Sequence, residues 1–252
     1  MESLKITLIF LTVSFNSIFA DFEVVITGPH SSSILEEDYL TTYIPIYVGV
    51  IVSLFTLLVI VLRLQGRPFL SESGFVRIWW GDIDSPENSQ HVTDWYTFTH
   101  MLHGLIFFYL TYPLLIWVHF TVNYNFVIAL VTEVVWEIVE NTKCVIGRYR
   151  RTEGSTEYGG DSVLNSVFDT IAMSAGFWLA WIIPWYATVG LAVVEEVVLA
   201  IVIRDNLVLN MVQIVFRVKC VSDCQERGKR KRVTNGKVGE VKTEEEEEEM
   251  NV

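Results

Sequence analysis

The sequence predicts an all-α membrane protein, a polytopic helical bundle with about five transmembrane helices after a signal peptide. Of its 252 residues, 51% are hydrophobic, and the mean hydropathy is +0.39. The apolar residues fall into blocks of about 20 residues, the length that crosses a bilayer as a helix. The basic residues cluster in alternate connections between these blocks, as they do in proteins that cross the membrane several times.

The N-terminal residues 1–20 have the pattern of a secretory signal peptide, with one lysine, a short apolar core and the small residue Ala20 at the cleavage position. Residues 21–42 are polar, and we expect them to form an external or lumenal segment. An uncleaved N-terminal anchor is the alternative that the sequence leaves open.

The predicted membrane domain covers residues 43–217. Five apolar runs in it are long enough to span the bilayer, at about residues 43–64, 98–120, 124–145, 162–183 and 186–203. Residues 204–217 are apolar but too short for a sixth span, so we expect an interfacial helix there. Residues 218–252 combine a basic cluster with a run of glutamates and lack apolar periodicity, which predicts a disordered cytosolic tail.

The distribution of lysine and arginine predicts the orientation. These residues occur after the first span, after the third span and in the tail, whereas the connections VHFTVNYN and IPWYA contain none. Because basic segments stay on the cytosolic side, we expect an external N-terminus and a cytosolic C-terminus. The predicted location is the plasma membrane or a membrane of the secretory pathway.

The formal net charge of −12 is partly local, because Glu244 to Glu249 form one acidic run. Nucleic acid is not expected as a partner, since it requires a basic surface. The lipid bilayer is the expected environment. The three cysteines are too few and too scattered for a disulfide framework or a zinc ribbon.

Ionisable residues recur inside the predicted spans, where they are costly and mark candidate functional positions. His100 and His103 share one face of the second span, Glu133 and Glu137 lie one turn apart in the third, and Asp169 follows the start of the fourth. Adjacent spans run in opposite directions, so these groups should gather roughly 8–10 Å or more below one membrane surface. The sequence therefore predicts one polar pocket that opens to the cytosol.

The pocket has the residue types of an acid–base or metal-dependent site. The expected catalytic residues are His100, His103, Glu137 and Asp169. Histidine with carboxylate suits Zn, Fe or Mn, so a divalent metal is the expected cofactor. The candidate metal ligands are His91, His100, His103, Glu133, Glu137 and Asp161. The candidate substrate-binding residues are Arg148, Arg150, Asp94, Asn141, Asn165 and Asp205, the two arginines being suited to an anionic headgroup or small molecule.

Four long polar blocks carry a resemblance to a known family: SPENSQHVTDWYTFTHMLHG, EVVWEIVENT, YGGDSVLNSVFDTIAM and RDNLVLN. In this order they resemble the bacterial integral membrane uncharacterised protein family 0314, over about residues 66–210. The resemblance implies a multi-pass membrane location and carries no established activity. The N-terminal segment and the tail lie outside the family pattern and are typical of a eukaryote-like member.

Three functions remain open at the level of sequence. The first is a membrane-embedded enzyme that acts on a lipid or another amphipathic substrate. The second is a structural or assembly protein whose buried polar groups satisfy one another between helices. The third is a small cation or proton transporter, although the chain has no inverted repeat. Whether the chain is an enzyme is left undecided, because it contains no GxSxG, HExxH or P-loop motif.

Overall fold

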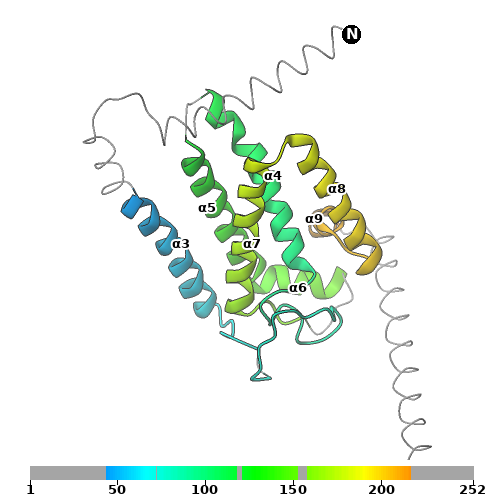
Figure 1. Ribbon diagram of the computed structural model, residues 1–252. Helices are drawn as coiled ribbons and strands as arrows, with labels where there is room; N and C mark the ends of the chain where they lie inside the picture. Colours follow the sequence, from blue (N-terminus) through cyan, green and yellow to red (C-terminus); the bar gives the residue numbers. More distant parts are fainter. Residues whose placement is uncertain (1–43, 72, 118–120, 153–157, 217–252) are drawn as a thin grey trace, which may run out of the picture. The chain divides into compact units, whose positions relative to one another are not determined.

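The computed structural model of the protein describes residues 44–71, 73–117, 121–152 and 158–216, and their regular elements are helices. Five of these helices are long and apolar enough to cross a membrane. They are α3 (Ile44–Leu64), α4 (Tyr96–Trp117), α5 (Val122–Glu140), α7 (Val163–Ile182) and α8 (Trp185–Val202) (Figure 1). The all-α class and the five candidate spans are therefore confirmed. The predicted signal peptide, external segment and tail lie outside the described residues.

Two shorter helices, α6 (Lys143–Thr152) and α9 (Leu207–Phe216), complete the described chain. The predicted third span, 124–145, differs from the structure, because α5 ends at Glu140 and α6 begins separately. Asn141 is the C-cap of α5, and its side-chain amide donates to the carbonyl oxygen of Glu137 at 3.1 Å. The predicted interfacial segment 204–217 is helical only from Leu207, because the side chain of Asn206 caps the first turn of α9 by accepting from the N–H of Leu209 at 2.8 Å.

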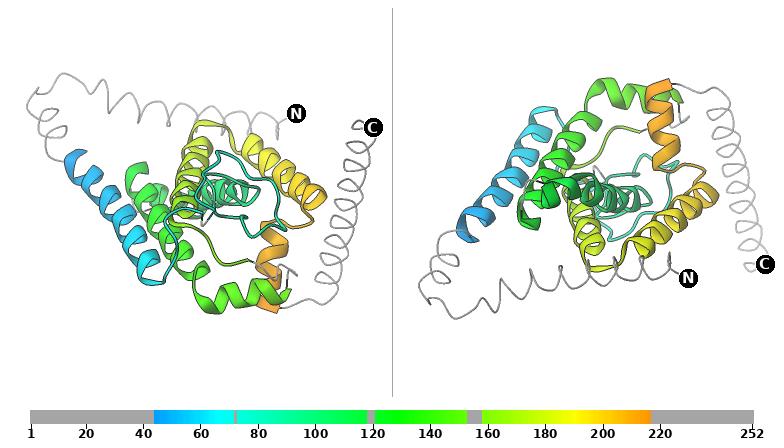
Figure 2. Two further views of the ribbon diagram at one scale, coloured as in Figure 1. Left: turned by 90° about the horizontal axis from the view of Figure 1, so that it is seen from below. Right: turned by 90° about the horizontal axis from the view of Figure 1, so that it is seen from above.

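The chain divides into two compact units, residues 1–50 and 51–252. Of the first unit only the first turns of α3 are described, and their apolar side chains are largely exposed, as expected of a lipid-facing helix. In the second unit, α4 packs most extensively against α7 and also contacts α5 and α8. Seen along its axis, α4 lies among these three helices (Figure 2).

The crossing of α4 and α7 depends on two glycines. A Cβ atom at Gly104 would lie 1.9 Å from the carbonyl oxygen of Met173, and a Cβ atom at Gly176 would lie 2.0 Å from that of Met101. Both distances are far below van der Waals contact and involve backbone atoms, so no side-chain movement relieves them. The two backbones touch because both positions lack a side chain, as is common at helix contacts in membranes.

The connection between α3 and α4 is tied to the N-terminus of α7. Ser162 caps α7 by accepting from the N–H of Asn165 at 3.1 Å. The N–H groups of Val163 and Leu164 donate to carbonyl oxygens of the connection at 2.8 and 3.1 Å, and that of Ser166 donates to the carbonyl oxygen of Ser162. The donors of the first turn of α7 therefore already have partners, and this end of the helix holds the connection in place.

Substitution of Gly104 by alanine should separate α4 from α7. The added methyl group meets backbone, so we expect Gly104→Ala to lower the unfolding free energy by about 3 kcal/mol, the upper end of overpacking costs. Gly190→Ala is the matched control, because an added Cβ at this glycine of α8 has nothing within 4 Å. Thermal unfolding in detergent measures both; equal midpoints for the two variants would contradict the close crossing.

Candidate functional site

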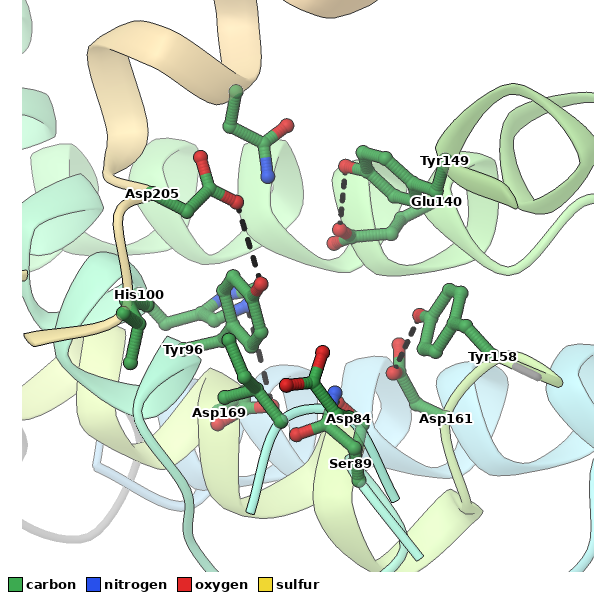
Figure 3. Close-up of a pocket in the computed structure, with 14 residues that line it drawn as sticks. Asp84, Ser89, Tyr96, His100, Glu140, Tyr149, Tyr158, Asp161, Asp169 and Asp205 are labelled. Atoms are coloured by element: carbon green, nitrogen blue, oxygen red, sulfur yellow. Dashed lines mark hydrogen bonds and ion pairs between the residues drawn. The ribbon is translucent and has the colours of Figure 1, made fainter. Parts of the chain in front are cut away.

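A pocket of about 710 Å³, counted with the space at its open mouth, lies where α4 and α7 begin and where α5 and α8 end. Carboxylates and tyrosines dominate its lining (Figure 3). They are Asp84, Glu140, Asp161, Asp169 and Asp205, with Tyr96, Tyr149 and Tyr158. His100 lines the same pocket, so four of the five long helices or the residues next to them contribute to one site.

Glu133 of α5 joins the two histidines of α4. Its carboxylate is fully buried and accepts from Nδ1 of His100 at 2.6 Å and from Nδ1 of His103 at 3.1 Å. Each oxygen thus has its own imidazole donor, and the two helices are joined by charge-assisted hydrogen bonds. With Nδ1 engaged, the other ring nitrogen of His100, Nε2, lies 4.0 Å from Oδ2 of Asp169 in α7.

One turn along α5, Glu137 is equally buried but has no such partners. Neither of its carboxylate oxygens makes a hydrogen bond, although Oε1 lies 3.2 Å from Nδ1 of His100. In Glu140, Oε1 accepts from the hydroxyl of Tyr149 at 2.8 Å, and Oε2 has no hydrogen-bond partner. Ligand atoms of His100, Glu137 and Glu140 lie within 4.8 Å of one another, so this group could hold a metal ion.

His100, His103 and Glu133 form a second group with ligand atoms within 4.8 Å of one another. The two groups differ in one respect. In the second group, the carboxylate and the two imidazoles already satisfy each other by hydrogen bonds. In the first, the oxygens of Glu137 make no hydrogen bond, and the nearby group that can balance its charge is the His100 imidazole at 3.2 Å, so a buried carboxylate here has room for a further cation or a proton. The group with Glu137 is therefore the better candidate metal centre.

Three further carboxylates of the lining are fixed by hydroxyl donors. Asp161 accepts from Tyr158 at 2.7 Å, and Asp205 accepts from Tyr96 at 3.3 Å. Asp169 accepts from the hydroxyl of Thr97 at 2.8 Å. Asp161 is additionally held by Asn141, which lies at the end of α5 and also accepts from its N–H.

Burial changes the acidity of the groups that lie outside the spans. It raises the pKa of Asp205 to about 6; nearby Glu196 adds to the increase, and the hydrogen bonds from Asn206 and Tyr96 oppose it. Burial likewise raises the pKa of Asp161, against the donors Tyr158 and Asn141. These carboxyls therefore bind protons, or exchange them for another cation, closer to neutral pH than ordinary aspartates do.

Several predicted site residues lie in the pocket or next to it, and two lie apart from the cluster around His100. Asp94 lies two residues before the start of α4, and its carboxylate accepts from the N–H of Tyr96 at 2.7 Å; burial raises its pKa to about 6. His91 belongs to the connection, where Nε2 lies 3.3 Å from Glu87, and burial lowers the pKa of its imidazole. Neither of them joins His100 in a candidate metal group of the described residues.

Three residues predicted to bind substrate, Arg148, Arg150 and Asn165, lie outside the pocket lining. Nε of Arg150 donates to the carbonyl oxygen of Tyr158 at 2.5 Å. Neither Arg150 nor Arg148 lines the pocket. Asn165, at the start of α7, is buried, and its Nδ2 has no hydrogen-bond partner; it too lies outside the lining.

The lining residues that were not chosen as site residues from the sequence include Glu140, Tyr149, Tyr158, Asn88 and Asn210. Glu140 continues the stripe of Glu133 and Glu137 at a spacing of seven, so the helical period contained its signal. The others come from a short helix, two connecting segments and α9, and no local periodicity marks them.

Comparisons with known proteins place the whole pocket inside one family region. A family described as "Protein of unknown function (DUF2585)" matches residues 62–227. A UPF0314 protein of Sinorhizobium fredii is 44% identical over 163 residues, which are 65% of this chain and 82% of the relative. A UPF0314 protein of Sphingopyxis alaskensis is 41% identical over 178 residues, 70% of this chain and 93% of the relative. Both relatives are bacterial and give no support to the predicted eukaryote-like character. No solved structure shows a significant match.

Asp205 should make stability depend on pH. Its pKa of about 6 in the folded protein exceeds the ordinary 3.8, so the folded state binds more protons between these values. The unfolding free energy therefore falls as the pH rises from about 4 to about 6. Asp205→Asn should flatten this part of the curve and stabilise the protein at neutral pH. Thermal midpoints between about pH 4 and 8 test this; parallel curves for wild type and variant would refute it.

Proposed function

We propose that this chain, which belongs to the UPF0314 (DUF2585) family of proteins of unknown function, is a membrane-embedded enzyme that uses a divalent metal to act on an amphipathic substrate. One observation carries the proposal. The carboxylate of Glu137 is fully buried without a hydrogen-bond donor, beside His100 and Glu140, which line an open pocket. A bound cation would give these oxygens the ligand contact that the His100 imidazole, 3.2 Å from Oε1, does not give as a hydrogen bond.

The proposed ligands are His100, Glu137 and Glu140. One imidazole nitrogen with carboxylate oxygens is a ligand set for Zn, Fe or Mn. Glu133 is the positioning residue, because its hydrogen bond to Nδ1 fixes the ring of His100 and leaves Nε2 as the nitrogen available to a ligand. Carboxylates commonly hold metal-bound histidines in this way. A bound divalent ion polarises a substrate carbonyl or phosphoryl oxygen and acidifies a bound water.

Asp169 is the proposed proton carrier. The hydroxyl of Thr97 fixes Oδ1 at 2.8 Å, and Oδ2 lies 4.0 Å from Nε2 of His100, on the pocket side of the ring. A carboxyl group at this place takes up or delivers a proton next to the proposed metal. His103, in contrast, donates to Glu133 behind the pocket, so its role is to hold that carboxylate.

The substrate is proposed to be amphipathic because of where the pocket lies. It opens at the ends of helices that are long enough to span the membrane, the depth at which lipid headgroups lie. A headgroup can enter the pocket while its apolar chains remain in the bilayer. The distribution of basic residues favours the cytosolic leaflet for this opening.

A structural role is the second candidate, and one observation favours it. Glu133 and the two histidines satisfy one another without any ligand. Such interhelical hydrogen bonds stabilise membrane helix bundles by about 0.6–1.7 kcal/mol each. A purely structural protein should bind no stoichiometric metal and convert no lipid.

The two candidates separate when metal content and turnover are measured on the same protein. We expect wild-type protein in lipid nanodiscs to contain about one divalent metal per chain, and mass spectrometry should show one lipid class being consumed. His100→Ala and the isosteric Glu137→Gln should lower both metal content and turnover by at least about tenfold.

Glu195→Gln is the matched control, because Glu195 is a buried glutamate of α8 that also lacks hydrogen-bond partners and does not line the pocket. It should keep both metal and turnover. Wild-type protein that is folded, free of stoichiometric metal and inert toward membrane lipids would leave the structural role as the better account.

A further inference from the structure

We infer that the substrate is an amphiphile whose headgroup carries a protonated amine. The inference rests on the proposed function, because it takes the ligand of the pocket to be a substrate. It adds the chemical class of the headgroup that the pocket selects. It draws on the charge of the lining, on its unsatisfied oxygens, on the spacing of its carboxylates and on the occupied donors at the start of α7 and at Arg150.

The charge of the pocket favours a cation. Five carboxylates line it, and among its described lining residues the one side chain that can carry a positive charge near neutral pH is His100. One divalent metal held with Glu137 and Glu140 offsets only part of this charge, and Asp161, Asp169 and Asp205 remain around the open space. Several carboxylates in a confined pocket attract a positively charged group and repel a phosphate or carboxylate.

The unsatisfied atoms of the lining are hydrogen-bond acceptors. Three lining residues have a solvent-shielded side-chain oxygen without a donor: Oδ1 of Asn88, Oε2 of Glu140 and Oδ1 of Asn210. Asn88 is itself only 6% exposed. An ammonium group has three N–H donors and no acceptor, so it matches such a set, whereas a phosphate brings further acceptors. These oxygens come from the α3–α4 connection, from α5 and from α9, on different sides of the pocket.

The lining carboxylates of Asp161, Asp169 and Asp205 suit a ligand that is larger than a single metal ion. In the described residues, Asp161, Asp169 and Asp205 belong to no group whose ligand atoms gather within 4.8 Å. Separate hydroxyl donors hold them apart, Tyr158 at Asp161 and Tyr96 at Asp205 (Figure 3). A second bare metal ion would lack a compact ligand set here. The tyrosine rings of the lining add faces that attract organic cations.

Two features that could bind an anion, the start of α7 and Arg150, already have partners. The N–H groups in the first turn of α7 have backbone and side-chain partners, so this helix end offers no donors to a phosphate. Nε of Arg150 is bound to the carbonyl oxygen of Tyr158. The anionic headgroup expected from the arginines therefore has less support in the structure than an amine.

Native mass spectrometry of the full-length protein, released from dodecyl maltoside micelles, tests the inference directly. Dodecylamine, dodecyl phosphate and dodecanol share one chain and differ in headgroup charge. We expect dodecylamine to bind stoichiometrically, and the other two to bind at least about tenfold more weakly, as the loss of one charge-assisted contact predicts. Equal or stronger binding of dodecyl phosphate would overturn the inference.

Substitutions of pocket residues that are not proposed metal ligands test whether dodecylamine binds in this pocket. Asp205→Asn and Asn210→Leu should each weaken dodecylamine binding about tenfold, by removing a charge or an acceptor. Glu195→Gln should leave the affinity unchanged, because Glu195 lies outside the lining. Amine binding that survives both pocket variants would place it elsewhere and would contradict the inference.

The metal content of the same samples distinguishes this inference from the proposed function. Protein that contains metal and consumes lipid but binds no dodecylamine would refute the amine headgroup and leave the enzyme intact. Protein that binds dodecylamine in the pocket but contains no metal and converts nothing would keep the ligand class and refute the enzyme.

Discussion

The buried carboxylate of Glu133 and its two imidazole donors form the interaction on which the rest of the site depends. A charged group inside a membrane bundle must be paired, and here each oxygen of the carboxylate takes one histidine. This pairing fixes α4 against α5 and sets the ring of His100. The glycine contact at Gly104, one residue after His103, brings α7 close enough for Asp169 to reach the same ring. The pocket is the consequence of these two constraints.

The site has two kinds of buried carboxylate, one with matched hydrogen-bond donors and one without them. Around Glu133 the donors and acceptors match, so that part is complete without a ligand. One and two turns farther along the same helix, both oxygens of Glu137 and Oε2 of Glu140 lack hydrogen-bond donors. Glu195 of α8 is a further buried carboxylate without hydrogen bonds, but it lies outside the pocket. We propose that a cation balances the unmatched acceptors that lie beside the pocket, around Glu137 and Glu140.

The spans and the central site residues could be predicted from the sequence because they follow helical periodicity. Length and hydropathy were sufficient for the five candidate spans, and spacings of three and four residues placed His100, His103, Glu133 and Glu137 on facing stripes. Tyr149, Tyr158 and Asn210 lie in short segments whose position depends on long-range packing, so no local pattern marks them. Arg150 shows a further limit: its charge suggested an anion site, while its backbone contact is visible only in the fold.

X-ray absorption spectroscopy at the edge of the bound metal tests the central claim, that His100 rather than His103 faces the ion. We expect wild-type protein to show imidazole nitrogen at about 2.0–2.1 Å with carboxylate oxygen at about 2.0–2.2 Å, if the metal is zinc. The imidazole signal should persist in His103→Ala, whereas His100→Ala should bind too little metal to give a signal. A metal without imidazole, or an imidazole signal that disappears in His103→Ala and persists in His100→Ala, would contradict the account.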